Sequence, residues 1–186
     1  MAELITGYGV EHEQQLEHIE EAVQQYLTFL VADKTYAVGI LEVNEIIEVS
    51  EMTDVPMMPD FIRGVINLRG QVVPVIDLAS RMRRGTTAIS KRSCIVLVRI
   101  RRTDGEKQPV GMLVDSVNEI VEINQDHMQP APNMGNGIDT RFIEAMGRVD
   151  DHFIILLAID HILSHEQLGQ IAQIADLDEA MLQNDE

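Results

Sequence analysis

The side chains that could do chemistry in this sequence are few and lie far apart. Cys94 is the only cysteine, and it falls within the apolar run from Ser93 to Ile100. A cysteine in such a run is usually a small buried hydrophobe, and no local group activates it. Asp77 and Asp160 could form an acid and base pair, but each follows an apolar run and precedes a helix-like segment, which favours capping. These residues indicate neither a nucleophile nor a carboxylate dyad.

The histidines do not form a convincing metal site either. His152, His161 and His165 cluster in the sequence, but a strand end, a helix start and a turn explain them one by one. No cysteine and no ligand-like spacing accompanies them. His12 and His18 lie among acids and are expected to be solvated. Because no nucleophile elbow, P-loop, dinucleotide fingerprint or zinc-protease motif is present, the sequence predicts a binding module with no cofactor.

Composition narrows the class of partner. The chain has 186 residues, 45% of them hydrophobic, only 4% aromatic and none of them Trp. Its formal net charge is −17, and residues 1–25 and 164–186 each contain six acids and no Lys or Arg. A nucleic-acid surface needs cations and stacking aromatics, so this composition argues against nucleic-acid binding. The charged ends are expected to serve solubility.

The compartment follows from three features of the sequence. A single cysteine cannot form an intramolecular disulfide, which fits a reducing environment. The N-terminal residues lack the basic and apolar blocks of a signal peptide. No apolar run reaches the length of about 18 residues that a membrane helix requires. We therefore expect a soluble, cytoplasmic protein that does not insert into the membrane.

The stretch FIRGVINLRGQVVPVIDL, residues 61–78, organises the rest of the chain. Two apolar runs flank Leu68-Arg69-Gly70, a turn signal that predicts a β-hairpin. Pro74 cannot donate a ladder hydrogen bond, which predicts an edge strand or a bulge. Asp77 is expected to cap a short helical turn, Leu78 to Met82. Arg69, a cation at the hairpin tip, is either a solvated turn residue or a partner contact.

The remaining elements are mostly short strands. Helical spacing predicts a thin amphipathic helix from Glu11 to Gln25, and Ser164 with Gln167 predicts a capping box that starts a helix ending near Ala175. Residues 1–10 and 176–186 are expected to lie outside the folded body. Residues 81–92 form a basic linker, for which a solvated role is favoured over a contact patch. Strands are expected at 26–32, 36–41, 42–49, 93–101, 109–115, 117–123 and 153–159.

An internal repeat relates the two halves of this strand pattern. Val43 to Val49 reads VNEIIEV and Val117 to Ile123 reads VNEIVEI, an offset of 74 that also relates Pro56 to Pro130. Each half contains two strands, the VNEI segment, a proline loop, a Phe-Ile segment and a hairpin. The chain is therefore predicted to be a duplication of two five-stranded modules, each a closed or nearly closed barrel. A partner is expected in the apolar groove between them.

These motifs resemble the signature of the CheW-like chemotaxis coupling proteins. The hairpin of residues 61–78, the VNEI segment at 117–120 and Gln129-Pro-Ala-Pro132 carry the resemblance, which extends from about Tyr26 to Ser164. It implies a mainly β fold of two pseudo-symmetric five-stranded SH3-like barrels with short helices and a C-terminal helix. The domain limits are then 1–25 for an acidic extension, 26–163 for the CheW-like domain and 164–186 for the helix and tail.

The resemblance also implies a function without catalysis. Such proteins are scaffolds that link the regulatory domain of a CheA-type histidine kinase to the cytoplasmic tips of methyl-accepting chemoreceptors, in arrays attached to the membrane through the receptors. The receptor tip, a helical hairpin, would lie in the groove between the barrels. An adaptor of a pilus-linked or other non-flagellar array is an alternative within this class. The competing class is an enzyme or small-ligand protein that uses the same groove.

Site residues follow from the resemblance position by position. It implies a kinase-facing contact at Gln129 and Met134, although both differ from the basic and aromatic residues of well-known members. Packing alone is an equally favoured role for Gly64, Cys94 and Ile120. The residues that the resemblance ties to receptor coupling are Val43, Glu45, Gly64, Arg69, Cys94 and Ile120.

Overall fold

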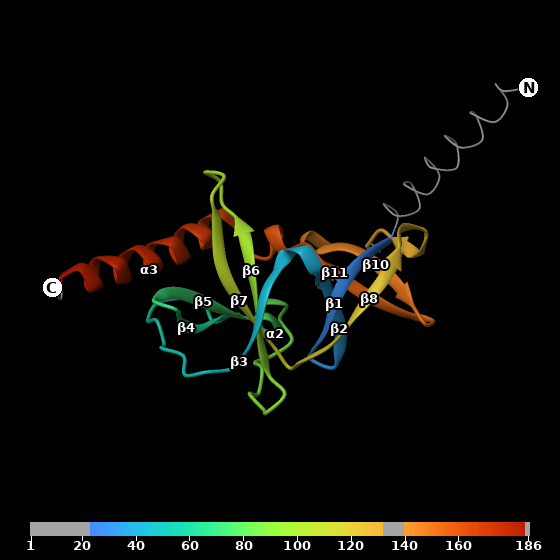
Figure 1. Cartoon of the computed structure of the whole chain (residues 1–186), viewed down its shortest axis with the longest axis horizontal. Helices are drawn as coiled ribbons and strands as arrows, with labels where there is room; N and C mark the ends of the chain where they lie inside the picture. The colour runs from blue at the N-terminus through green and yellow to red at the C-terminus, as the bar shows by residue number, and fades with distance from the viewer. Residues whose placement is uncertain (1–22, 132–139, 185–186) are drawn as a thin grey trace, which may run out of the picture.

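Strands dominate the protein and form two sheets side by side (Figure 1). A computed structural model describes residues 23–131 and 140–184 of the chain. The first sheet has the order β8-β1-β2-β11-β10-β9, with bounds Ser116–Asn124, Val23–Val31, Lys34–Gly39, His152–Leu157, Ile143–Val149 and Met128–Gln129. The second has the order β3-β6-β7-β5-β4, with bounds Val43–Glu48, Cys94–Arg101, Lys107–Val114, Gln71–Asp77 and Ile62–Leu68. The fold is mainly β, as the sequence predicted.

The helical elements are short apart from the last. They are α2 (Leu78–Arg81), α3 (His165–Asn184) and the 3-10 turns η1 (Ile40–Glu42), η2 (Gln125–His127), η3 (Thr140–Phe142) and η4 (Ile159–His161). None of the helices in the described ranges combines the length and apolar character that crossing a bilayer requires.

The hairpins are set by residues that tolerate positive φ. Arg69 and Gly70 have φ of 52° and 83° between β4 and β5, so the expected hairpin at residues 61–78 is confirmed. Asp150 and Asp151, with φ of 49° and 64°, make the corresponding turn between β10 and β11. Two positive φ values in succession match the right-handed twist of the paired strands. Local turn chemistry therefore fixes the register of both hairpins.

The two sheets do not correspond to the two halves of the sequence. The first sheet takes β1 and β2 from the first repeat and β8 to β11 from the second, whereas the second sheet takes β3 to β5 from the first and β6 and β7 from the second. Parallel pairing joins the repeats at equivalent places, β2 with β11 and β5 with β7. The duplication is visible in the matching strand order, but strands are exchanged between the repeats, so neither repeat completes a sheet from its own strands.

Both sheets close into SH3-like barrels through the segment that follows the VNEI strand. After β3, Thr53 exchanges two backbone hydrogen bonds of 2.9 Å with Val65 on β4. After β8, β9 pairs with β10 at the equivalent place. Pro74, expected at an edge or a bulge, instead lies in β5 between β7 and β4, so the edge assignment is wrong. The position tolerates proline because pairing with β7 begins only at the next residue, Val75.

One core is shared by the two barrels. Alternate residues of β6, Val96, Val98 and Ile100, join Phe29 of β1 and residues of β2 and β7 in the largest apolar cluster. The intervening residues Ile95 and Leu97 fill the interior of the second barrel. A strand buried on both faces reads as a continuous apolar run, which is why residues 95–98 show no alternation. The barrels are therefore packed against each other as one unit.

The C-terminal helix is docked on this unit. Ser164 and Gln167 form the predicted capping box, with Gln167 N donating to Ser164 Oγ at 3.1 Å and Ser164 N donating to Gln167 Oε1 at 2.8 Å. Leu168 and Ile171 are buried in the shared core. The helix extends to Asn184, past the end expected near Ala175, because the following residues are mostly good helix formers.

Arg81 lies where the two halves meet. Its guanidinium carbon is 4.9 Å from the centroid of Phe61 and 4.4 Å from that of Phe142, which are the equivalent residues of the two repeats. Its Nε donates to Ile162 O at 2.6 Å. Cation–π contacts and a charged hydrogen bond together stabilise this junction, so a single side chain from the first repeat contacts both halves of the chain.

The structure corrects two assignments made from the sequence. Asp77 caps α2 as expected, accepting from Ser80 N at 3.3 Å. Asp160 lies inside η4 and does not cap it. The residue equivalent to Asp77 in the second repeat is Ala158, because Ala158 N donates to Phe142 O just as Asp77 N donates to Phe61 O. Ala158 has no side-chain oxygen that could cap the turn. The helix predicted from Glu11 to Gln25 is wrong in its last three residues, because Val23 to Gln25 belong to β1 and pair with β8. The rest of that predicted helix lies outside the described residues.

Replacing Arg81 with Ala should lower the free energy of unfolding by about 2 kcal/mol, because two ring contacts and a hydrogen bond to Ile162 O are lost. Urea denaturation followed by circular dichroism measures the change. Arg148→Ala is the matched control, because that arginine forms only an exposed pair with Asp151 and should cost under about 1 kcal/mol. Equal losses in the two variants would show that Arg81 does not fasten the halves.

Candidate functional site

The two VNEI strands present isoleucines to solvent. Along β3, Val43, Glu45 and Ile47 are half-buried while Asn44, Ile46 and Glu48 are exposed. Ile46 is 42% exposed, and Ile120, its equivalent on β8 of the other barrel, is 54% exposed. Both strands stand at one end of their sheet's order, so each pairs along its length with a single neighbouring strand in the described sheets. The repeat thus places matching apolar side chains on the two barrels.

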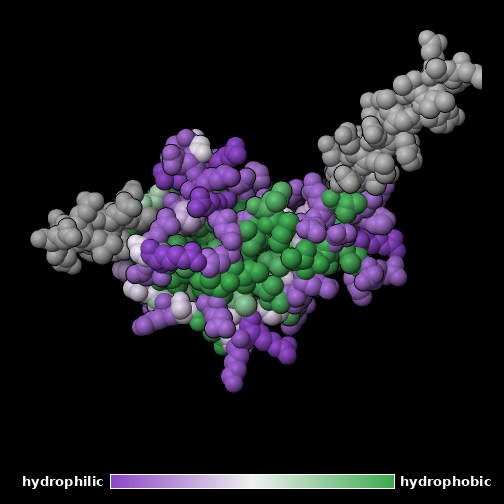
Figure 2. Space-filling model, in the orientation of Figure 1, coloured by the Kyte–Doolittle hydropathy of each residue, from purple (hydrophilic) through white to green (hydrophobic). Residues whose placement is uncertain are grey.

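An apolar area lies between the barrels on one face of the molecule. Figure 2 shows hydrophobic residues gathered across the middle of the face, where β1 and β3 lie in Figure 1, with hydrophilic residues around them. Leu41, in the turn η1 that leads from one barrel to the other, is 96% exposed. Contiguous exposed apolar surface with a polar rim is typical of a protein-binding site. The face between the barrels, where the sequence predicted a partner, is therefore apolar.

Arg69 and Glu45 form an ion pair beside this surface. Arg69 Nη2 donates to both carboxylate oxygens of Glu45, at 2.8 and 2.9 Å. The Arg69 side chain is 72% exposed and that of Glu45 36%. The hairpin tip keeps its shape through Asn67 Oδ1, which accepts from Gly70 N. The pair links the hairpin to β3 and leaves the guanidinium open to a partner.

Gly64 has a structural role in the described fold. It is buried, with φ of +152°, and a Cβ there would lie 2.6 Å from the carbonyl oxygen of Thr53. That oxygen accepts the hydrogen bond from Val65 N that closes the barrel. Only glycine allows the chain to approach so closely. Gly64 thus acts on the hairpin's position and not by direct contact.

The other sequence-predicted residues fall into separate places. Val43 faces Val98, and Cys94 faces Glu48, on the paired strands β3 and β6, where both are half-buried. Ile120 lies on β8 of the other barrel, opposite Leu27. Gln129 is exposed on β9 beside Met146. Met134 lies outside the described residues. The structure therefore brings Arg69 and Glu45 into contact and distributes the other described residues along β3, β4, β6, β8 and β9.

A buried polar network supports the base of the hairpin. Asp77 is fully buried and accepts from Arg63 Nη1 at 2.9 Å, Thr87 N at 2.9 Å and Thr87 Oγ1 at 2.8 Å. Arg63 Nη1 also donates to Thr87 O at 3.0 Å. A buried carboxylate is stable only when charge and hydrogen bonds compensate it, as here. The network fastens the linker of residues 81–92 to the hairpin.

Sequence reasoning missed three contributors to this site. Ile46 and Leu41 add exposed apolar area, and the repeat itself could have identified Ile46 as the equivalent of Ile120. Thr87 carries no sequence signal, because its role depends on a hydrogen bond to a residue ten positions away.

A depression beside the apolar face offers little to an enzyme. It has a volume of about 590 Å³ and is lined by Glu42, Glu144, Asp160, Arg141 and His161 with apolar neighbours. Burial, and then the charges of Glu144 and Asp160, raise the pKa of Glu42. A raised carboxyl pKa can mark an acid catalyst, but the described residues that line this depression include no serine, threonine or cysteine. Its groups do not form a nucleophile and base arrangement.

Comparison with known proteins identifies relatives of the whole barrel pair. The model of the CheW-like domain family matches residues 25–167. The chemotaxis protein CheW of Klebsiella aerogenes is 28% identical over 156 residues, covering 84% of this chain and 91% of the relative. That of Helicobacter pylori is 30% identical over 146 residues, covering 78% and 85%. The crystal structure of the scaffolding protein TtCheW from Thermoanaerobacter tengcongensis superposes with a TM-score of 0.69 at 34% identity, covering 77% of this chain and 90% of that one.

Gly64→Ala should lower the free energy of unfolding by about 1–3 kcal/mol, because a Cβ collides with the Thr53 carbonyl and the backbone must shift. Thermal or urea denaturation measures the loss. Gly70→Ala serves as control: its φ of +83° is also unfavourable for alanine, but a Cβ there meets no atom within 4 Å. If the two substitutions cost the same, the close approach at Thr53 contributes nothing and the structural role of Gly64 is wrong.

Proposed function

The chain belongs to the CheW-like family, and we propose that it is a scaffold that couples the cytoplasmic tips of methyl-accepting chemoreceptors to the regulatory domain of a CheA-type histidine kinase. The observation that carries the proposal is the open apolar face between two barrels, flanked by the exposed Arg69–Glu45 pair. Nothing in this surface requires a reaction. In this role the protein is cytoplasmic and reaches the membrane through its receptors.

The receptor side of the proposal rests on burial. A helical hairpin has apolar stripes that need a complementary apolar surface, and Ile46, Leu41 and Ile120 offer one. Polar groups at the rim then fix register and orientation rather than supplying most of the affinity. Arg69, held by Glu45 but largely exposed, is suited to this task because its guanidinium has donors that Glu45 does not use.

The kinase side of the proposal rests on the barrels as rigid modules. The family resemblance implies that the kinase regulatory domain has a similar fold, so one barrel of each protein can associate face to face. Gln129 lies exposed on β9 of one barrel, whereas Arg69 lies at the tip of the β4–β5 hairpin of the other. Contacts made by different barrels allow one chain to bind two partners at once, which a scaffold requires.

Arg69→Glu should weaken binding of a purified receptor tip about tenfold or more, because a rim cation becomes an anion, while the melting temperature changes little. An exposed ion pair contributes only about 0–1 kcal/mol to folding, so stability is the internal control. Isothermal titration calorimetry with the receptor tip measures binding.

The charge swap Glu45→Arg with Arg69→Glu separates two roles of the pair. It restores an ion pair within the protein but leaves a carboxylate where the partner meets the hairpin. We expect binding to stay weak in this double variant. Recovery to the wild-type affinity would show that the pair only holds the hairpin in place, and that Arg69 is not a contact residue.

A further inference from the structure

Five arginines line one hollow of the surface where α3 begins. The hollow has a volume of about 630 Å³ and receives arginines from three separate segments: Arg81 and Arg83 at and after α2, Arg101 and Arg102 at the end of β6, and Arg141 in η3. These segments come from both repeats and converge only in the folded chain. The concentration of cations is therefore a product of the topology.

The hollow contrasts with the charge of the chain. The sequence contains 14 Lys and Arg in all and a formal net charge of −17. Among the described residues, the hollow nevertheless has a single carboxylate in its lining, Asp160, together with His161 and His165. Because salt screens charges beyond about 8–10 Å, the local excess of cations governs what binds here rather than the net charge.

Several of these side chains are held in place before any partner arrives. Arg81 is stacked between Phe61 and Phe142 and bonded to Ile162 O. Arg102 forms an ion pair of 2.9 Å with Asp104. Asp160 Oδ1 accepts from the backbone N of Arg101 at 3.2 Å and so is partly engaged by the chain itself. A preorganised cluster loses less entropy on binding than mobile cations do.

We propose that this hollow binds a short acidic segment of a partner protein. Guanidinium groups match carboxylates in geometry and charge, and the cluster presents several within one hollow. Arg83, Arg101 and Arg141 are exposed, which leaves the hollow open at the surface. A pocket for a small molecule buries most of its ligand, so an open hollow is better suited to a peptide.

The surroundings give the acidic segment a preferred side. Arg141, Asp160 and His161 also line the neighbouring depression, whose other polar groups are Glu42 and Glu144. Carboxylates there repel an acidic segment. Its charged residues are therefore placed toward Arg83 and Arg101, which line the hollow but not that depression.

This surface is separate from the receptor-coupling residues. Arg69 lies at the tip of the β4–β5 hairpin and Ile120 on β8, and neither lines the hollow. The Arg69→Glu variant should therefore bind an acidic peptide as the wild type does. The inference stands or falls independently of the proposed coupling function.

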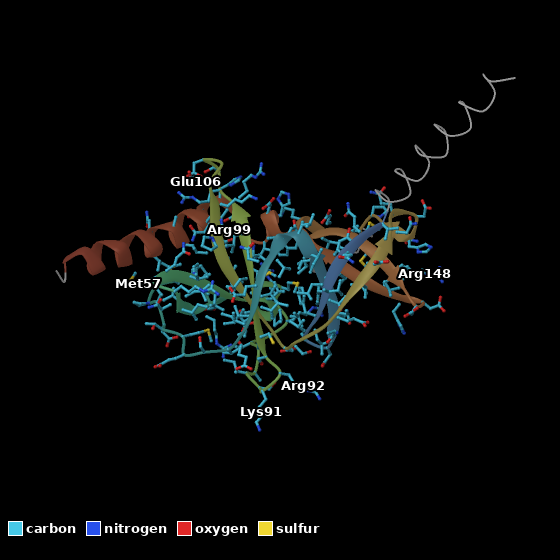
Figure 3. The ribbon with its side chains drawn as sticks, viewed as in Figure 1. Met57, Lys91, Arg92, Arg99, Glu106 and Arg148 are labelled. Carbon is cyan, nitrogen blue, oxygen red and sulfur yellow. The ribbon has the colours of Figure 1, made fainter. Side chains whose placement is uncertain are left out.

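The test measures binding of a rhodamine-labelled oligoglutamate peptide to the full-length protein by fluorescence anisotropy at an ionic strength of about 0.15 M, where charges are screened beyond about 8 Å. Arg83→Glu with Arg101→Glu reverses two exposed cations of the hollow. Arg92→Glu with Arg148→Glu makes the same change in net charge at two exposed residues that do not line the hollow and that lie far apart from each other (Figure 3). We expect the first double variant to lose about tenfold or more in affinity and the second to lose less than about twofold.

Equal losses in both double variants would overturn the proposal, since net charge and not the hollow would control binding. Failure of the wild type to bind the peptide would also overturn the proposal. So would displacement of the peptide by inorganic phosphate at equal concentration, because the hollow would then be a phosphate site. A measurement on the unmodified chain guards against misfolded variants: the imidazole NMR signals of His161 and His165 should shift with the peptide. Unchanged signals at peptide saturation would contradict binding here.

Discussion

The exchange of strands between the two repeats is the constraint on which the rest of the structure depends. Each barrel obtains two strands from one repeat and the remainder from the other, so the barrels cannot move apart without breaking sheet hydrogen bonds. The strands that cross over are buried on both faces, and their outward residues form the shared core. Arg81 adds a polar contact at the same junction by stacking on the equivalent phenylalanines of both repeats. The relative placement of β3 and β8, and with it the apolar face, is consequently fixed by the core.

A surface fixed in this way suits recognition without chemistry. Rigid partners lose little conformational entropy when they associate, so modest contacts are enough for specific binding. Gly64 and the Asp77 network extend the same rigidity to the hairpin that carries Arg69, because one closes the barrel and the other anchors the following linker. The buried residues of the family signature thus support the exposed ones, as Gly64 does by allowing the close approach of Thr53 to the hairpin.

Features encoded by nearby residues could be predicted from the sequence. The hairpin at Arg69-Gly70, the Asp77 cap and the Ser164–Gln167 box each depend on a few neighbouring side chains, and the repeat predicted two barrels. The exchange could not be predicted, because both swapped and unswapped barrels have the same strand order along the chain. Asp160 was misassigned because an aspartate two residues past the equivalent position looks the same in sequence. The Thr87 contact and the arginine hollow depend on long-range convergence, for which local patterns carry no signal.

The central claim is that one rigid pair of barrels binds two partners at different places on its surface. The most direct test mixes the purified chain with a receptor tip and a kinase regulatory domain, and follows the complexes by sedimentation velocity. The account predicts a ternary species in which both partners are bound to one chain at the same time. Displacement of one partner by the other, or binding of neither, would contradict it.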